Sequence, residues 1–153
     1  MIHILFVCHG NICRSPMAEF ILKAMAKAHH VSDRLLIASA ATSPEELGND
    51  MSYRAKSMLT LNHIPFKRHT ATKLTRADYD RYDYIIGMDS FNMRNMLRLF
   101  GDDPQNKLRL LLSFAGRAAD IDDPWYSDNY EIAYSDIYEG CEALMTHLME
   151  AGL

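Results

Sequence analysis

The sequence predicts an α/β protein in which helices cover both faces of a mainly parallel sheet. Four short runs are dense in apolar residues and alternate little with polar ones, as is typical of strands buried on both faces. Helical patterns separate these runs, and strands that alternate with helices favour a parallel sheet. The chain has 153 residues, so we expect a single domain, residues 1–153, folded as a three-layer sandwich with four strands.

The elements of this fold follow one another in a simple order. Strands are predicted at residues 2–7, 35–39, 84–88 and 108–113. Helices are predicted at residues 17–29, 51–62, 90–99 and 129–149. Repeats, low-complexity tracts and proline- or glycine-rich linkers are absent, which supports one compact unit.

The turn between the first strand and the first helix has the composition of a phosphate-binding loop. It reads Cys8-His9-Gly10-Asn11-Ile12-Cys13-Arg14-Ser15-Pro16. Pro16 suits the start of a helix, where free N–H groups and the positive end of the helix dipole attract an anion. Gly10 and Asn11 tolerate the left-handed backbone that a tight turn requires. We therefore expect the amides from His9 to Arg14 to point inward.

Two side chains of this loop suggest covalent phosphoryl transfer. Amides, a helix N-terminus and an arginine together favour the thiolate form of Cys8, which is the nucleophilic form. The planar guanidinium of Arg14 matches two oxygens of a phosphate group. Ser15 can donate its hydroxyl to the sulfur and stabilise it as a leaving group. A purely structural Cys8 is the alternative, but it would not call for an arginine on the same turn.

The loop, continued by Met17-Ala18-Glu19, resembles the low-molecular-weight protein tyrosine phosphatase family. The resemblance covers essentially the whole chain, because later segments match in order: Ser39-Ala40-Ala41-Thr42-Ser43, Tyr82-Asp83-Tyr84-Ile85-Ile86 with Met88-Asp89, and Asp123-Pro124-Trp125-Tyr126. It implies a protein tyrosine phosphatase that hydrolyses phosphotyrosine and aryl phosphates through a cysteinyl phosphate. No cofactor is expected, and none of the seven histidines falls in a metal-ligand spacing.

A phosphatase also needs an acid to protonate the leaving oxygen. Asp123 precedes Pro124, and a proline restrains the residue before it to extended conformations, which fixes the direction of the carboxylate. The resemblance implies that Asp123 is the general acid and afterwards the base that activates water. Asp122 is the alternative, and we expect it to be a solvated neighbour.

The resemblance also implies residues that support the loop. It assigns Asn11 to a hydrogen-bond network with Ser39 and with a histidine, for which His69 is the candidate. His69 matches only if one residue is inserted after Pro65, and an exposed histidine is the alternative. Asp89 is expected to bind Arg14, a role compatible with capping the following helix.

Three residues are expected to form the walls of the substrate cleft. Trp125 and Tyr126 are either core aromatics or surfaces that stack on a phosphotyrosine ring. The family often has two tyrosines at these positions, whereas this chain has tryptophan at the first. Glu45 lies where the family varies, and an acid there is expected to disfavour acidic sequences beside the phosphotyrosine.

The three cysteines, Cys8, Cys13 and Cys141, form neither a disulfide framework nor a zinc motif. The resemblance implies that Cys8 and Cys13 form a reversible disulfide that protects the thiolate from further oxidation. Cys141 lies within a predicted helix and is expected to be structural. The lack of a disulfide framework indicates a reducing compartment. The sequence also shows no basic leader and no run of 18 apolar residues, so we expect a cytoplasmic protein.

The net charge of the chain argues against some classes of binding partner. The formal net charge is −4 at pH 7, which argues against binding to nucleic acid or anionic membranes. The expected partners are phosphotyrosine proteins or small aryl phosphates, with a tyrosine kinase as a further candidate. We expect a monomer or weak self-association.

Three other functions use related loops. An arsenate reductase of this fold needs additional cysteines near the middle of the chain, where residues 80–95 contain none. A phosphocysteine carrier of a sugar phosphotransferase needs neither Arg14 at this spacing nor Asp123. A non-catalytic phosphate-binding module would have no use for Cys8 together with Asp123.

Overall fold

The computed structural model, which describes residues 1–153, contains one sheet with the strand order β2-β1-β3-β4. The strands are β1 (Ile2–Cys8), β2 (Leu35–Ala41), β3 (Tyr84–Gly87) and β4 (Leu108–Leu110). All neighbouring strands are parallel. Because β1 pairs with β2 on one side and β3 on the other, the order of connections reverses at β1. Such a switch point is where open parallel sheets bind their ligands, at the carboxyl ends of the strands.

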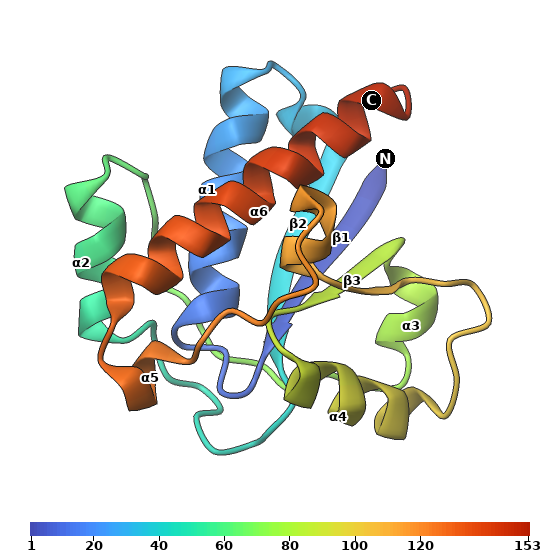
Figure 1. Ribbon diagram of the computed structural model, residues 1–153, viewed down its shortest axis with the longest axis horizontal. Coiled ribbons are helices and arrows are strands. Elements are labelled where there is room, and N and C mark those ends of the chain that lie inside the picture. The colour runs from blue at the N-terminus through green and yellow to red at the C-terminus, as the bar shows by residue number, and fades with distance from the viewer.

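Helices cover both faces of the sheet (Figure 1), as expected from the sequence. The longer ones are α1 (Arg14–Ala28), α2 (Tyr53–Leu61), α4 (Ser90–Phe100) and α6 (Tyr130–Glu150). Two single-turn helices, α3 (Asp78–Arg81) and α5 (Pro124–Ser127), and two 3₁₀ turns, η1 (Ser32–Arg34) and η2 (Leu111–Ala115), complete the chain.

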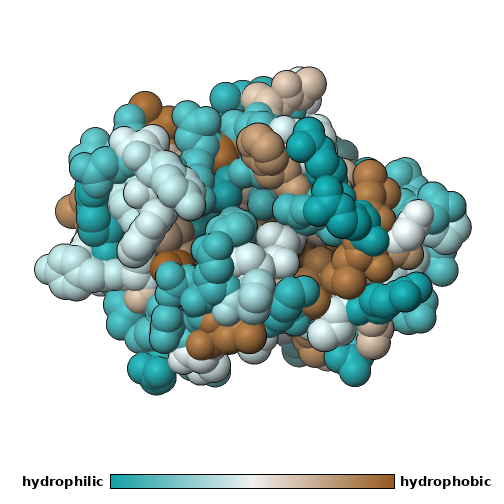
Figure 2. Space-filling view, turned by 90° about the horizontal axis from the view of Figure 1, so that it is seen from below, coloured by the Kyte–Doolittle hydropathy of each residue, from teal (hydrophilic) through white to brown (hydrophobic).

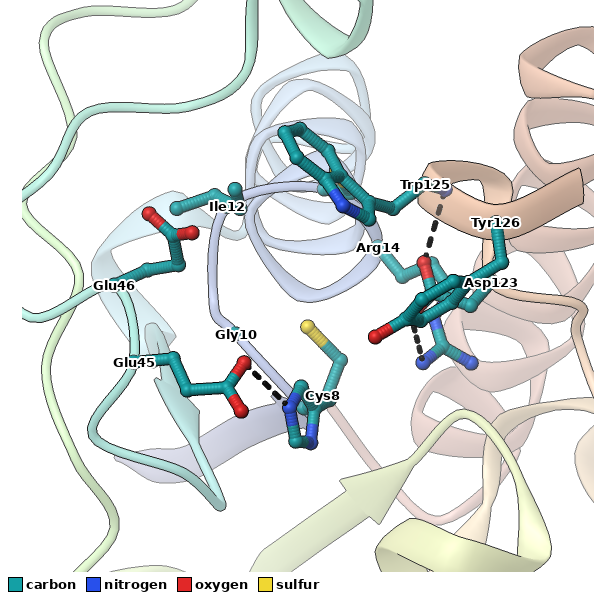
Figure 3. Close-up of a pocket in the computed structure, with 11 residues that line it drawn as sticks. Cys8, Gly10, Ile12, Arg14, Glu45, Glu46, Asp123, Trp125 and Tyr126 are labelled. Atoms are coloured by element: carbon teal, nitrogen blue, oxygen red, sulfur yellow. Dashed lines mark hydrogen bonds and ion pairs between the residues drawn. The ribbon is translucent and has the colours of Figure 1, made fainter. Parts of the chain in front are cut away.

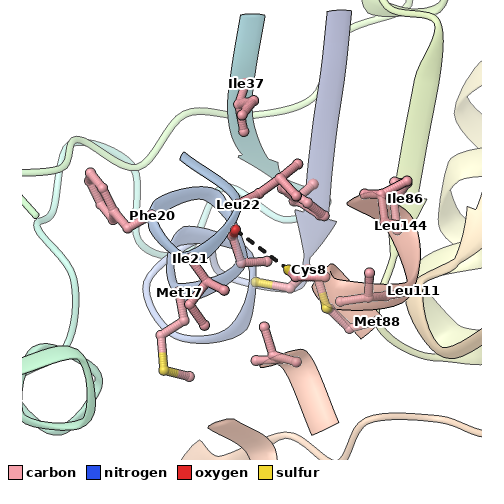
Figure 4. Packing of buried hydrophobic residues seen from close by; sticks show 14 of the residues in the cluster. Cys8, Met17, Phe20, Ile21, Leu22, Ile37, Ile86, Met88, Leu111 and Leu144 are labelled. Atoms are coloured by element: carbon pink, nitrogen blue, oxygen red, sulfur yellow. Dashed lines mark hydrogen bonds between the residues drawn. The ribbon is translucent and has the colours of Figure 1, made fainter. Parts of the chain in front are cut away.

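The side chains of β1 divide the core into two clusters, one on each face of the sheet. Ile4 and Phe6 pack with residues of α1, α2 and α6, and this larger cluster reaches Cys8 at the end of the strand (Figure 4). Leu5 and Val7 point the other way and pack with residues of α3 and α4. This alternation is what a strand between two helical layers requires. Both faces of β1 are thus buried, which makes its end a rigid base for the loop.

One predicted strand is shorter than expected. The apolar run at residues 108–113 is a strand only as far as Leu110, and it continues as the turn η2. Leu111 and Leu112 are both fully buried in the same cluster, whereas consecutive side chains of a strand point to opposite faces. Leu111 packs closely on Gly140 of α6, where an added Cβ would lie 2.5 Å from the Leu111 Cγ atom.

Other differences concern the ends of the helices. α1 begins at Arg14, three residues before the predicted start, so the arginine of the loop already belongs to the helix. The short helices α3 and α5 were not predicted, because one turn of helix has no apolar periodicity to detect. None of the helices combines the length and the apolar character needed to cross a bilayer.

Candidate active site

The loop that joins β1 to α1 forms the base of a pocket at the end of the sheet, on the face of the molecule seen in Figure 2. Asn11 has the left-handed φ of 59°, which turns the chain between Cys8 and α1. Cys8 and Arg14 both line the pocket, as do other residues of the loop (Figure 3). The spacing in the sequence therefore corresponds to one curled loop, as expected.

Asn11 is the centre of the hydrogen-bond network that holds this loop. Its side-chain Nδ2 donates to the hydroxyls of Ser15, at 2.8 Å, and Ser39, at 2.9 Å. Its Oδ1 accepts from the backbone N–H of Thr72 at 3.1 Å and lies 3.1 Å from Nε2 of His69. Asn11 is fully buried, and its amide uses both donors and both acceptor sites. This satisfied network stabilises the left-handed turn.

The structure brings together the supporting residues proposed from the sequence. The ring of His69 also lies 2.8 Å from the backbone carbonyl of Asn11, and His69 is buried. The hydroxyl of Ser39 donates to Glu19 at 2.6 Å. Glu19 and Thr72 were not identified from the sequence as parts of this network. Their contacts join segments far apart in the chain, and spacing alone carries no signal for them.

The sulfur of Cys8 lies inside the curl of the loop. Its Sγ is 3.0 Å from the hydroxyl of Ser15 and accepts from the backbone N–H of Asn11 at 3.3 Å. Both contacts favour a negatively charged sulfur, because each places a donor hydrogen beside it. Ser15 is itself oriented by Asn11, so the same network positions the group that faces the sulfur.

Arg14 is almost completely buried and is held by three oxygens. Its Nη1 donates to Asp89 Oδ2 and to the Ile121 carbonyl, both at 2.7 Å. Its Nη2 lies 3.5 Å from Oδ2 of Asp123. Burial alone would lower the pKa of Arg14, but the nearby charges of Cys8, Asp89 and Asp123 outweigh it and raise that pKa. The guanidinium is therefore a fixed positive charge at the pocket.

Asp89 has both roles expected from the sequence. Its Oδ1 accepts the backbone N–H of Asn92 at 2.8 Å and caps α4, while its Oδ2 binds Arg14. The side chain of Asn92 completes a capping box by accepting the backbone N–H of Asp89. The cap fixes the carboxylate, and the carboxylate in turn fixes the plane of the guanidinium.

Asp123 reaches the pocket from the other end of the chain. It precedes α5, and its Oδ1 accepts the backbone N–H of Trp125 at 3.1 Å. The carboxylate faces Arg14 and lines the same pocket as Cys8 (Figure 3). Asp122 is exposed and lines a neighbouring hollow instead. The geometry thus favours Asp123 over Asp122 as the acid.

The rim of the pocket is partly aromatic and partly acidic. Trp125 and Tyr126 are 58% and 77% exposed, so they are walls of the cleft and not core residues. Glu45 lies on the opposite side, with Oε2 3.0 Å from Nε2 of His9. Glu46 also lines the pocket and was not identified from the sequence, where it is one of twenty acidic residues.

The thiol of Cys13 lies beside the same pocket in a different environment. Its Sγ is within 3.3 Å of the hydroxyl of Ser52 and 3.5 Å of that of Tyr130. Burial raises the pKa of Cys13 and outweighs these hydrogen bonds, which lower it. The neutral thiol is therefore favoured at this position. Cys8 and Cys13 are both free thiols.

Nothing in the structure resembles a metal centre. No group of three or more histidine, cysteine, aspartate or glutamate side chains is placed to hold a metal ion. Arg14 and the N-terminus of α1 supply positive charge to the pocket. This arrangement can bind a phosphate, attack it with a thiolate and supply a proton from a carboxyl group.

The whole chain is similar to one family of known proteins. The family model described as low molecular weight phosphotyrosine protein phosphatase matches residues 3–152. The rat protein of that name is 36% identical over 147 residues, which cover 93% of this chain and 92% of the rat chain. The crystal structure of YfkJ from Bacillus subtilis is 33% identical, with a TM-score of 0.95, and the match covers 100% of this chain and 98% of YfkJ. A low molecular weight protein tyrosine phosphatase from Streptococcus pyogenes is 36% identical, with a TM-score of 0.87, over 97% of this chain and 93% of that chain.

Proposed function

The chain belongs to the low molecular weight phosphotyrosine protein phosphatase family, and we propose that Cys8, Arg14 and Asp123 are its catalytic residues. As a member of this family it is a hydrolase of phosphotyrosine. The observation that carries the assignment of residues is that a thiol, a buried guanidinium and a carboxyl group line one pocket, although they come from opposite ends of the chain.

In the first step Cys8 attacks the phosphorus atom of the substrate. A sulfur–phosphorus bond forms while the bond to the phenolic oxygen breaks, and Asp123 donates its proton to that oxygen. Arg14 and the amides from His9 to Arg14 bind the three remaining phosphate oxygens, whose charge develops in the transition state. The phenol leaves neutral, and the enzyme holds a cysteinyl phosphate.

In the second step water attacks the cysteinyl phosphate. Asp123, now ionised, accepts a proton from the water, and the sulfur–phosphorus bond breaks to release inorganic phosphate. The hydroxyl of Ser15, 3.0 Å from the sulfur, stabilises the thiolate as it leaves. One carboxyl group thus serves both steps. Since the cycle requires an ionised Cys8 and a protonated Asp123 at its start, turnover should be best on the acid side of neutrality.

The aromatic walls select the kind of phosphate ester. The exposed rings of Trp125 and Tyr126 stand above the loop, where they can stack on the ring of a phosphotyrosine. A pocket lined by these two rings favours aryl over alkyl phosphates. The carboxylates of Glu45 and Glu46 at the opposite rim disfavour acidic residues beside the phosphotyrosine. Comparing acidic and neutral phosphopeptides with Glu45→Gln tests this effect, and unchanged selectivity would remove it.

Among the alternatives, an arsenate reductase would require a further redox-active cysteine that this chain lacks. Such a reaction passes oxidation from the loop to further cysteines, and the only cysteine outside the loop is Cys141. That side chain is fully buried in α6, and burial raises its pKa. A non-catalytic phosphate-binding module would leave the convergence of Cys8 and Asp123 without a purpose.

The family supports phosphotyrosine proteins as the general kind of substrate. We propose in addition that a tyrosine kinase supplies these substrates, that the protein acts in the cytoplasm as a monomer or weak self-associating species, and that peroxide reversibly joins Cys8 to Cys13. Oxidation followed by reduction of a Cys13→Ser variant tests the last point. Recovery as complete as in the parent protein would remove the protective role of Cys13.

One assay tests the chemistry. Turnover of para-nitrophenyl phosphate is measured in EDTA, with and without vanadate, for the parent protein, Cys8→Ser and Asp123→Ala. We expect turnover in EDTA, inhibition by vanadate, background activity for Cys8→Ser and reduced activity for Asp123→Ala. Parent-like turnover by Cys8→Ser, or loss of turnover in EDTA that added metal restores, would contradict the proposal.

A further inference from the structure

The segment that carries His69 has little regular structure of its own. Residues 65–72 contain neither helix nor strand, and they run between α2 and α3. His69 nevertheless reaches Asn11 at hydrogen-bond distance. A partly buried carboxylate on the facing segment provides the anchor that this placement requires.

That carboxylate is Asp50, which precedes α2 and takes no part in the proposed chemistry. Its Oδ1 accepts the backbone N–H of His69 at 2.9 Å and that of Met51 at 2.7 Å. Its Oδ2 lies 2.6 Å from Nζ of Lys56 and 3.9 Å from Nη1 of Arg68. The side chain of Asp50 is only 18% exposed. The two oxygens therefore have separate partners, backbone amides for one and cationic side chains for the other.

Backbone hydrogen bonds align the two segments on either side of this contact. The N–H of Ala71 donates to the carbonyl of Asn49 at 2.8 Å, and the N–H of Gly48 donates to the carbonyl of Ala71 at 2.9 Å. Asp50 extends this pairing to His69. Burial opposes ionisation, but hydrogen bonds from Lys56, His69 and Met51 lower the pKa of Asp50 to about 2. The carboxylate is thus charged in neutral solution.

The ring of His69 connects Asp50 to the phosphate loop. Both groups that face its Nε2, the carbonyl and the Oδ1 of Asn11, are acceptors, because Asn11 Oδ1 also receives the N–H of Thr72. Nε2 therefore carries the hydrogen and donates it to Asn11. A shift of the His69 backbone would move this donor away from the residue on which the left-handed turn depends.

We propose that Asp50 is a positioning residue that seats His69, and through it Asn11 and the phosphate loop, by means of its Oδ1 acceptor. The inference rests on the proposed function of the loop. Asp50 contacts neither the substrate pocket nor the reacting atoms. Its contribution is to shape the anion site, so its loss should weaken anion binding as well as turnover.

Two substitutions of Asp50 separate the effect of its hydrogen-bond acceptor from the effect of its charge. Asp50→Asn keeps an oxygen for the two backbone N–H groups and removes the charge, whereas Asp50→Glu keeps the charge and displaces the acceptor by one methylene group. Lys56→Met is the matched control, because it removes the nearer cationic partner of Oδ2 and leaves the contacts of Oδ1 in place. Vanadate affinity is measured by titration, together with kcat and KM for para-nitrophenyl phosphate.

We expect Asp50→Asn and Lys56→Met to bind vanadate within about twofold of the parent, and Asp50→Glu and Asp50→Ala to lose about tenfold in affinity and in kcat/KM. On a His69→Ala background, Asp50→Ala should have little further effect, because both substitutions remove the same anchor. Thermal unfolding of each variant establishes that folded proteins are compared. If Asp50→Ala does not fold, Asp50→Asn and Asp50→Glu still decide the question.

Three results would overturn the inference: parent-like vanadate affinity in Asp50→Glu, an affinity that follows the charge and not the acceptor, or additive effects of Asp50→Ala and His69→Ala. Cys8→Ser in the same series reports on the proposed function. Turnover by Cys8→Ser would refute the catalytic assignment, whereas the vanadate titrations of the Asp50 variants require no turnover and would still test the anchor.

Discussion

The phosphate loop and the segment that carries Asp123, the proposed acid, are built in opposite ways. Asn11 and Arg14 are almost completely buried, and hydrogen bonds tie them to strands, helices and distant segments. Trp125 and Tyr126 beside the acid are mostly exposed, and the hydrogen bonds of residues 123–127 are largely local. The buried parts bind a group that is the same in every substrate. The exposed parts meet the variable remainder of the substrate.

This comparison implies that changes in the loop should affect all substrates, whereas changes in the acid segment should depend on the leaving group. A phosphate needs preorganised donors, since any reorganisation during the reaction raises the barrier. The rate that a proton donor adds is larger when the oxygen is a poorer leaving group without a proton. The substitutions below test this distinction, beginning with the one that should reduce activity most.

Arg14→Lys should lower kcat/KM by about 10³-fold for every aryl phosphate. A lysine retains the charge but cannot bind Asp89, the Ile121 carbonyl and two phosphate oxygens with one planar fork. Steady-state kinetics with several aryl phosphates measures the effect. A loss confined to poor leaving groups would show that Arg14 acts through Asp123 and not on the phosphate.

Asp123→Asn should lower kcat by about 10²-fold with phenyl phosphate, whose leaving group needs a proton. The loss should be much smaller with para-nitrophenyl phosphate, because nitrophenolate leaves readily. The measurement is kcat against the acidity of the leaving group. Asp122→Asn is the matched control. An equal loss across all leaving groups would remove the assignment of Asp123 as the general acid.

Asn11→Ala should reduce kcat/KM by about tenfold or more and destabilise the protein by about 2–3 kcal/mol. The substitution removes one hydrogen bond each from Ser15, Ser39 and Thr72 and places alanine in a left-handed turn. Chemical denaturation and vanadate titration measure the two effects. Parent-like values of both would contradict the role of Asn11 as the centre of the network.

The charge of Asp50 should make the stability of the loop support depend on pH. Its pKa of about 2 in the folded protein lies below the unfolded value of about 3.9, so its contribution is present above about pH 4 and is lost as the pH falls towards 2. Asp50→Asn keeps the backbone hydrogen bonds and loses only the charge, so it should be less stable than the parent by roughly 1 kcal/mol at pH 7 and by progressively less below pH 4. Unfolding curves at several pH values measure the difference. A constant difference would contradict the electrostatic origin.

Trp125→Leu should have the smallest effect, about a threefold rise in KM for phosphotyrosine peptides with little change in kcat. The indole is exposed at the rim and contacts no reacting atom of the loop. Because aliphatic phosphates lack a ring to stack on it, their KM should not change. A large fall in kcat would show instead that Trp125 holds the acid segment in place.

Much of the fold was predictable because its signals are local. The apolar runs identify all four strands, and the long helices follow from periodicity, since burial of both sheet faces imposes both patterns. The end of the last strand was wrong: Leu111 and Leu112 turn together towards Gly140, a contact made across about thirty residues of sequence. Helix ends were displaced for a similar reason, since caps such as Cys13 depend on the loop that precedes them.

The identity of the loop could be inferred from the sequence alone, because Cys8, Arg14 and the residues between them lie on one turn whose geometry is set locally. The sequence also singled out Asp123, through the restraint imposed by Pro124. The resemblance named His69 as a candidate, but the packing of distant segments decided which groups complete the site. Thr72 reaches Asn11 from the same segment as His69, while Asp50 holds the backbone of His69 and Glu19 holds Ser39. Hydrogen bonds between such segments depend on how the chain packs, and spacing along the sequence does not encode that packing.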